Sequence, residues 1–331
     1  MGLLDFLRRR RLPLRFVYSD DYWMVPFGRH VFPVRKYRLI YEKLLALGAG
    51  KEHFLKPEPA AEENLLLVHT AKYLKKLSSG ALSPAEVQAL EIPFSPELHR
   101  FFILQVGGTV QTARQALRDG ICVHLGGGFH HAFPDHGEGF CVLNDVAVAV
   151  EVLRREGRVG RAMIVDCDVH QGNGTAAVFA GRDGVFTFSI HQMDVYPADK
   201  PSSTLDVGLW AGDGDEAYLA ALGAHIPRIY REFGPEIVVF LAGADPLAGD
   251  QLGGLLLSEK GMAARDRIVI GEARRLGLPV AVVLAGGYGR EVESTVAAHL
   301  NTIKTAAAAL RKTPGPRDRA GVRGAFPRKS T

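Results

Sequence analysis

Two short groups of polar residues in this sequence could bind one metal ion. Residues 166–170 read Asp-Cys-Asp-Val-His directly after an apolar run that predicts a buried strand. In the loop beyond that strand, Asp168 and His170 stand two residues apart and can offer an oxygen and a nitrogen donor to the same cation. A second apolar run ends shortly before Asp245, which adds a third donor. Three protein ligands leave one coordination position open for water, which is typical of catalytic zinc sites.

A pair of histidines, His130 and His131, follows another apolar run and a row of glycines. A single histidine at such a place is more often structural. Two adjacent imidazoles near a candidate metal site favour acid–base chemistry instead, because imidazole titrates near neutral pH and can take a proton from water and pass it to a leaving group. Asp166 and Asn173 are the expected orienting partners, each bonding the far ring nitrogen of one histidine.

Asp166 has an alternative role as a second metal ligand, because the pattern Asp-x-Asp-x-His also occurs in two-metal hydrolases. Such sites need a further acidic pair. Gly243 stands two residues before Asp245, where the extra acid would be required. The sequence therefore favours a single catalytic metal.

A tyrosine and two aromatic segments complete the candidate site. Tyr288 follows two glycines, and although this pattern alone predicts only a turn, its hydroxyl could stabilise an oxyanion by about 2.7 to 4 kcal/mol. Phe140, which follows Gly139, and Tyr196 lie near the same predicted sheet edge. These aromatic residues either cap the core or wall a narrow apolar tunnel for a long alkyl side chain, with a glycine carbonyl free to accept a hydrogen bond from an amide.

The elements that would position these groups alternate along the chain. Strands are expected at 16–18, 121–125, 162–165, 185–190, 237–242 and 279–285, and helices at 97–117, 142–155, 216–232, 258–275 and 291–310. Alternation of this kind predicts an α/β fold, a single-domain open parallel sheet with helices on both faces, and the unbroken apolar strands indicate burial on both sides. Ligands of such sheets bind beyond the carboxyl ends of the strands. Every polar group described above falls there.

The composition is that of one soluble domain. The chain has 331 residues, of which 47% are hydrophobic and 23% charged. The net charge of +4 is unevenly spread, because residues 1–15 contribute +4 and residues 311–331 contribute +6, which leaves −6 for the body. Short cationic termini are usually only solvated, so we expect no specific nucleic-acid binding. No apolar stretch is long enough for a membrane span. Three scattered cysteines favour reduced thiols and a cytoplasmic location.

Five motifs resemble signatures of the histone deacetylase superfamily. They read His-Val-Phe-Pro-Val-Arg-Lys-Tyr at 30–37, Gly-Gly-Gly-Phe-His-His-Ala-Phe at 126–133, Gly-Glu-Gly-Phe-Cys-Val-Leu-Asn-Asp at 137–145, Asp-Cys-Asp-Val-His-Gln-Gly-Asn-Gly-Thr at 166–175 and Ala-Gly-Ala-Asp-Pro-Leu-Ala-Gly-Asp at 242–250. Within the superfamily, His-Gln-Gly-Asn-Gly at 170–174 and Tyr-Pro-x-Asp at 196–199 are most similar to the class IV branch and its bacterial relatives. The resemblance implies the arginase/deacetylase fold over a catalytic domain of residues 16–310, between a basic N-terminal segment (1–15) and a flexible basic tail (311–331).

The resemblance also implies a role for each candidate residue. It assigns Asp168, His170 and Asp245 to zinc, with ferrous iron as an alternative metal. His131 becomes the general base and then the general acid, while His130 is an electrostatic partner held by Asp166. Tyr288 polarises the scissile carbonyl. The residues expected to line the acyl-lysine channel are Gly139, Phe140, Leu252 and Tyr196, and those expected to bind a structural potassium ion are Asp166, Asp168, His170, Ser189 and Ile190.

Two positions depart from the family pattern. Asn173 stands where class I enzymes have an aspartate behind the second histidine; other branches share this change, which is expected to lower the basicity of His131. Gln251 follows Asp250 where many members have arginine, so recognition of anionic regulators through that arginine is not expected here.

The predicted function is hydrolysis of an acyl group from the ε-amino group of lysine in a protein or peptide. An amidohydrolase of small acetylated amines, such as acetylpolyamines, is the first alternative, and a preference for longer fatty acyl groups is a further possibility. A second alternative is a non-catalytic module that uses the basic termini to bind nucleic acid or a membrane. That function would leave the candidate metal ligands, the histidine pair and Tyr288 without a role. The oligomeric state cannot be read from the sequence.

Overall fold

One sheet organises the molecule. A computed structural model describes residues 14–25, 27–28 and 30–312. The sheet has eight strands in the order β2-β1-β3-β8-β7-β4-β5-β6, and all neighbours are parallel. The strands are β1 (Arg15–Val17), β2 (Phe54–Leu55), β3 (Ile121–His124), β4 (Ala162–Asp166), β5 (Val185–Gln192), β6 (Leu205–Leu209), β7 (Ile237–Leu241) and β8 (Val280–Val283). The four central strands are buried along their whole length, as parallel strands covered on both faces must be.

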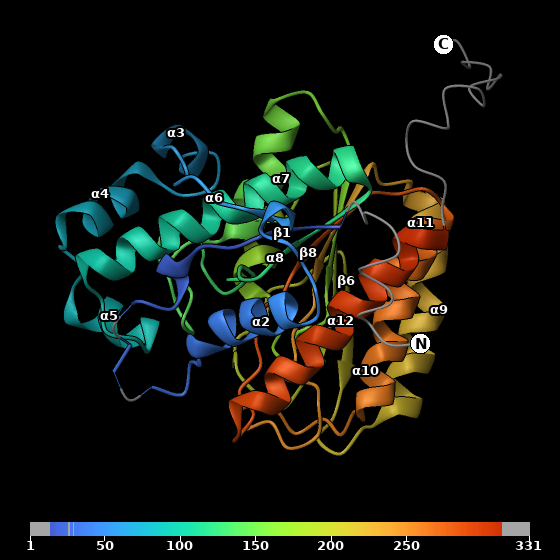
Figure 1. The fold of residues 1–331 in the computed structure, drawn as a ribbon. Coiled ribbons are helices and arrows are strands. Elements are labelled where there is room, and N and C mark those ends of the chain that lie inside the picture. Colours follow the sequence, from blue (N-terminus) through green and yellow to red (C-terminus); the bar gives the residue numbers. More distant parts are fainter. Residues whose placement is uncertain (1–13, 26, 29, 313–331) are drawn as a thin grey trace, which may run out of the picture.

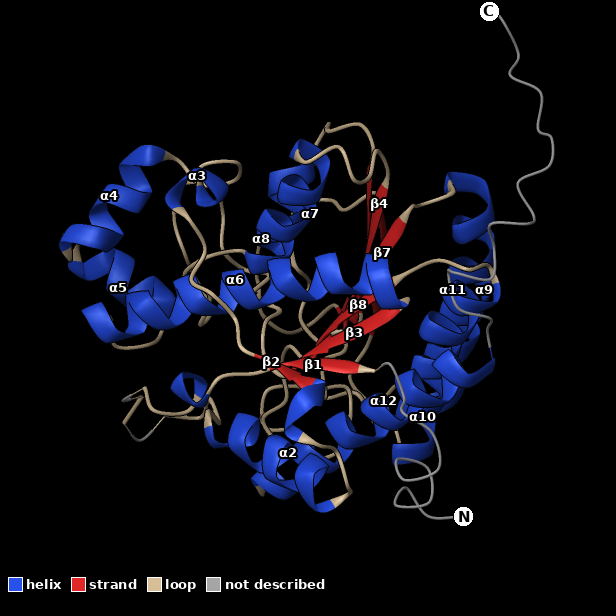
Figure 2. Cartoon of the chain, turned by 45° about the horizontal axis from the view of Figure 1, so that its top comes forward, coloured by secondary structure: helices blue, strands red, loops and turns tan. Residues whose placement is uncertain are grey.

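Helices cover both faces of the sheet, as Figures 1 and 2 show. One layer contains α6 (Pro96–Asp119), α7 (Asp145–Arg155) and α8 (Asn173–Phe179), and the other contains α2 (Arg35–Ala46), α9 (Asp215–Phe233), α10 (Glu259–Asp266), α11 (Glu272–Arg275) and α12 (Val292–Lys312). Three shorter helices lie beside the first layer: α3 (Glu62–Leu65), α4 (Ala71–Ser79) and α5 (Pro84–Leu90). Single turns form at η1 (Asp20–Tyr22), η2 (Lys51–His53) and the π-helical segment η3 (Arg267–Gly271).

Side-chain caps fix where the helices near the site begin. Asn144 caps α7 by accepting a 2.9 Å hydrogen bond from the amide of Ala147, and its own amide donates to the Thr175 hydroxyl at 3.0 Å. The same Asn144 amide donates to the Ala132 carbonyl at 3.2 Å. One buried side chain thereby ties the segment after the histidine pair to the starts of two helices. The helix α8 begins at Asn173, whose side chain is buried.

The predicted fold class is confirmed, with differences at its edges. All six expected strands are present within two residues at each end, whereas the edge strands β2 and β6 were missed. The expected helix at 258–275 is interrupted by η3 between α10 and α11. The predicted basic N-terminal segment and tail lie almost entirely outside the described residues. Among the described residues, no helix has the length and apolar character needed to cross a membrane.

Candidate active site

The candidate site lies beyond the carboxyl ends of β3, β8, β7 and β4, which are consecutive neighbours in the sheet. Each strand is followed by a loop that contributes one part. The loop after β3 carries the histidine pair, the loop after β4 carries Asp168 and His170, the loop after β7 carries Asp245, and the loop after β8 carries Tyr288. Because parallel strands all end at the same edge, four segments far apart in sequence meet in one crevice.

The three predicted metal ligands are brought together. Donor atoms of Asp168, His170 and Asp245 all lie within 4.8 Å of one another, and all three residues are buried. Oδ1 of Asp245 accepts a 2.9 Å hydrogen bond from the Val169 amide, but its Oδ2 is buried without a hydrogen-bond partner in the described part of the chain. Oδ2 of Asp168 accepts from the Gly286 amide at 2.9 Å.

The electrostatics of this cluster suit a cation. Burial raises the pKa of the Asp245 carboxyl, and the neighbouring charge of Asp168 raises it further. The pKa of Asp168 is lowered despite its burial, because His130 and His170 favour its charged form. A buried, orphaned carboxylate oxygen beside a second carboxylate and an imidazole is the donor set that a divalent ion such as zinc or iron accepts. The residues present therefore fit the metal that the sequence predicts.

The two adjacent histidines have different partners. Nδ1 of His130 lies 2.7 Å from Oδ2 of Asp166, and Nδ1 of His131 lies 2.7 Å from Oδ1 of Asn173. Burial opposes a charge on His130, but the carboxylates of Asp166 and Asp168 outweigh it and raise the pKa of His130 to about 9. Burial and the positive neighbour lower the pKa of His131. The two imidazoles therefore differ in proton affinity, and His130 holds a proton more tightly than His131 does.

Asn173 determines which nitrogen of His131 carries the hydrogen. Its Oδ1 also accepts from the Gly174 amide at 3.0 Å, and its Nδ2 donates to Oε1 of Glu138 at 2.5 Å. An amide oxygen can only accept, so Nδ1 of His131 donates and Nε2 is left with its lone pair. That is the tautomer a general base requires.

The Tyr288 loop is held from the β7 side of the crevice. Oδ2 of Asp250 accepts from the Tyr288 amide at 2.6 Å, and Nε2 of Gln251 donates to the Tyr288 carbonyl at 2.7 Å. Burial, together with the negative charges of Asp168 and Asp245, raises the pKa of the Tyr288 phenol. The phenol is therefore a protonated hydrogen-bond donor at neutral pH. A Cβ at Gly286 would collide with Asp245, so this loop can approach the carboxylates only because it lacks a side chain there.

A narrow hollow connects these groups to the outside. Its walls include the backbone and side chains of Phe32, Tyr37, Gly127, Gly128, Phe129, His130, His131, Gly139, Phe140, Cys141, Asp168, His170, Ala285, Gly286 and Tyr288. Gly139 and Phe140 thus line it as expected, whereas Leu252 and Tyr196 are not among the lining residues. The ring of Tyr196 is nevertheless 4.9 Å from that of His131, nearly perpendicular to it.

The residues predicted to bind potassium are partly assembled. Asp166 and Ser189 are paired in register on β4 and β5, and both are buried, as is Ile190. The Ser189 hydroxyl lies 2.9 Å from Nδ1 of His191.

Sequence reasoning missed four residues that support the site: Lys36, Glu138, Asp250 and Arg265. Lys36 is buried, its Nζ donates to the Ala285 carbonyl at 2.6 Å, and burial lowers its pKa to about 8. Lys36, Glu138 and Asp250 fell inside the quoted motifs, but a single charged residue carries no sign of its partner. Their position inside these motifs is the only signal of a role that the sequence offers for these three residues.

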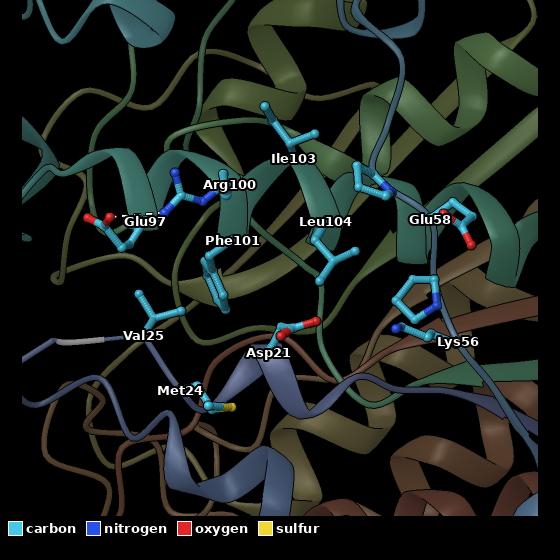
Figure 3. Close-up of a pocket in the computed structure, with 12 residues that line it drawn as sticks. Asp21, Met24, Val25, Lys56, Glu58, Glu97, Arg100, Phe101, Ile103 and Leu104 are labelled. Carbon is cyan, nitrogen blue, oxygen red and sulfur yellow. Dashed lines mark hydrogen bonds and ion pairs between the residues drawn. The ribbon is translucent and has the colours of Figure 1, made fainter.

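A second hollow of about 560 Å³ lies beside the N-terminal half of α6 (Figure 3). Apolar side chains such as Phe101 and Leu104 form its floor, and Glu97 and Arg100, paired at 2.9 Å, stand at its edge. None of the predicted catalytic or metal-binding residues lines it. The predicted catalytic and metal-binding residues gather instead around the smaller hollow at the strand ends.

The fold and the site together define an α/β protein of the arginase/deacetylase fold. Within that class the chain belongs to the histone deacetylase family, because a model of the histone deacetylase domain matches residues 30–303. Membership makes it a deacetylase-like amidohydrolase.

Several known proteins are similar to this chain. An uncharacterised protein of Picosynechococcus sp. is 38% identical over 284 residues, covering 86% of this chain and 95% of that protein. Histone deacetylase 2 of Arabidopsis thaliana is 31% identical over 294 residues, covering 85% and 76% respectively. The crystal structure of a histone deacetylase homologue from Aquifex aeolicus superposes with a TM-score of 0.76 at 26% identity, over 91% of this chain and 84% of that one.

Proposed function

We propose that this protein is a zinc-dependent amidohydrolase that removes acetyl or longer acyl groups from the ε-amino group of lysine in proteins or peptides. The observation that carries the proposal is that three metal donors lie within 4.8 Å of one another beside a histidine, His131, whose Nδ1 is bonded by Asn173. His130, His131 and Tyr288 border the same narrow hollow as Asp168 and His170. A hollow of this shape admits an extended side chain more readily than a bulky one.

Each residue has a defined task in the reaction. A divalent cation held by Asp168, His170 and Asp245 would supply Lewis-acid polarisation of water and of the acyl carbonyl. Nε2 of His131 takes the proton of the attacking water, while the Tyr288 hydroxyl donates a hydrogen bond to the oxygen on which negative charge develops. His131 then gives its proton to the departing lysine nitrogen.

The proposal also covers the bound ions and the cellular compartment of the enzyme. Ferrous iron is an alternative to zinc, because two carboxylates and one imidazole accept several divalent ions. A structural potassium ion would lie with Asp166, Asp168, His170, Ser189 and Ile190. The cytoplasm is the proposed compartment, in keeping with three cysteines that are buried and free.

A substrate panel tests this function and its alternative. Purified protein loaded with zinc or with ferrous iron is assayed on lysine peptides carrying acetyl to long fatty acyl groups, and in parallel on acetylpolyamines. Metal-dependent release of acid from the peptides supports the proposal. Hydrolysis confined to acetylpolyamines would assign the small-amine function instead, and a folded, metal-loaded protein that hydrolyses none of them would refute both.

A further inference from the structure

Glu138 lies in a tight turn that follows the histidine pair in the chain and borders the narrow hollow. The turn pairs Glu138 with Cys141, and the residues between them, Gly139 and Phe140, line the hollow. The amides of Gly139 and Phe140 donate to carbonyls at the end of α5, at 3.0 and 2.9 Å. The turn is therefore held in place independently of the Glu138 side chain.

One oxygen of that side chain joins two residues of the site. Oε1 of Glu138 accepts from Nδ2 of Asn173 at 2.5 Å and from the Tyr196 hydroxyl at 2.8 Å. Its other oxygen lies 3.8 Å from Nε2 of His136. The Glu138 side chain is 24% exposed, so it reaches solvent while its Oε1 accepts both bonds.

We propose that Glu138 is a positioning residue that orients the general base through Asn173 and anchors Tyr196 to the same carboxylate. The inference rests on the proposed function, since it concerns the efficiency of His131 in that reaction. Asn173 bears no charge, and Glu138 is the carboxylate that bonds it from the side opposite His131. In this arrangement Asn173 accepts the hydrogen bond from His131, and Glu138 supplies the carboxylate behind it. The two residues together take the place of a single aspartate.

The reason lies in the symmetry of an amide group. Oδ1 and Nδ2 of asparagine have nearly the same shape, so the side chain can turn over and present its NH2 group to His131. A carboxylate can only accept, and Glu138 therefore holds Nδ2 on its own side and Oδ1 on the side of His131. If the amide turned over, Nδ1 of His131 would have to accept, Nε2 would carry the hydrogen, and the ring could no longer act as a base.

A set of variants tests this role by steady-state kinetics on an acyl-lysine peptide. Glu138→Ala is expected to lower kcat by about tenfold to a hundredfold, the range for loss of a hydrogen bond to a charged group, with a smaller change in KM. Glu138→Gln keeps one acceptor oxygen, but its amide can also turn over, so its kcat should lie between those of Glu138→Ala and the wild type. Tyr196→Phe removes only the second bond and should raise KM more than it lowers kcat. Asp135→Asn, three residues before Glu138 and 71% exposed, is the matched control and should leave both constants unchanged.

A charge exchange provides the decisive arm. Asn173→Asp places two carboxylates against each other and should lower kcat. Adding Glu138→Gln to that variant lets the new amide donate to the new carboxylate, so the double variant should be at least about fivefold more active than Asn173→Asp alone. A purely structural role for the turn does not produce this recovery.

Two results would overturn the inference: wild-type kcat and KM in Glu138→Ala, or no recovery in the double variant. If Glu138→Ala fails to fold, as judged by circular dichroism and metal content, the exchange pair still decides the matter because it conserves side-chain volume. An inactive wild-type enzyme would count against the proposed function and not against the role of Glu138, so the two failures are distinguishable.

Discussion

Nη1 of Arg265 donates a 2.5 Å hydrogen bond to the carbonyl oxygen of Gly243. The same nitrogen lies 3.3 Å from the carbonyl oxygen of Cys167. Arg265 has no exposed surface, and Asp266 balances its charge at 2.8 Å. A single guanidinium group therefore joins the loop that precedes Asp245 to the loop that carries Asp168.

The first prediction concerns this bridge. Lysine at 265 keeps the positive charge but lacks the planar fork that can bond two carbonyls and Asp266 together. Arg265→Lys is therefore expected to weaken metal binding by about 10- to 100-fold, as the loss of a group that orients metal ligands does elsewhere. Competition with a fluorescent zinc chelator measures the affinity for zinc. The control is Arg267→Lys, two residues further along the chain at an exposed position. Equal affinities for zinc in Arg265→Lys and the wild type would exclude the role.

The second prediction concerns the Tyr288 phenol. Tyr288→Phe removes only the hydroxyl, which the high pKa keeps protonated and able to donate. Loss of one such donor corresponds to a decrease of about 100- to 1,000-fold in kcat. Stopped-flow or endpoint assays of the metal-loaded variant check the value, with an unchanged melting temperature as the control for folding. A turnover close to that of the wild type would show that the oxyanion is stabilised elsewhere.

The third prediction concerns the metal itself. A ligand that binds only the folded state stabilises it by RT ln(1 + [L]/Kd), so zinc added to the metal-free protein should raise its melting temperature. In Asp245→Asn the orphaned oxygen loses its charge, and the zinc-dependent increase should largely disappear. Differential scanning calorimetry at matched zinc concentrations gives both values. An equal increase in the variant would mean that Asp245 is not a ligand.

The central strands and the convergence at their ends could be predicted from the sequence because both depend on local patterns. An unbroken apolar run ending in polar residues predicts a buried parallel strand and its loop, which is why the sequence predicts that Asp168, His170 and Asp245 lie close together. The edge strands β2 and β6 were missed for a physical reason: one is two residues long and the other is only partly buried, so neither carries that pattern.

The supporting residues were missed because their roles depend on tertiary contacts. Glu138 lies 35 positions from Asn173, and Arg265 lies 98 from Cys167. Nothing in the type or the spacing of an isolated glutamate or arginine indicates such a partner. The expectation that Asn173 weakens the basicity of His131 was likewise made without knowledge of the carboxylate behind it.

The fourth prediction concerns stability and pH. His69 is buried, with Nδ1 lying 3.0 Å from the Phe133 carbonyl and Nε2 accepting from the Asn144 amide at 3.0 Å. His69 thereby connects Phe133 and Asn144, the two ends of the segment that follows the histidine pair. Burial lowers the pKa of His69 to about 4, because a proton on Nε2 would have no acceptor.

The unfolded chain binds this proton near pH 6.5, whereas the folded protein resists it until about pH 4. The contribution of His69 to the free energy of unfolding is therefore complete above pH 6.5 and is lost as the pH falls toward 4, by about 3 kcal/mol in total. His69→Gln can make both hydrogen bonds but does not titrate. Urea unfolding at intervals between pH 7 and pH 4.5 should show a shallower loss of stability in His69→Gln than in the wild type. Parallel curves would mean that the proton is taken up elsewhere, for instance at His124, whose pKa burial lowers to about 3.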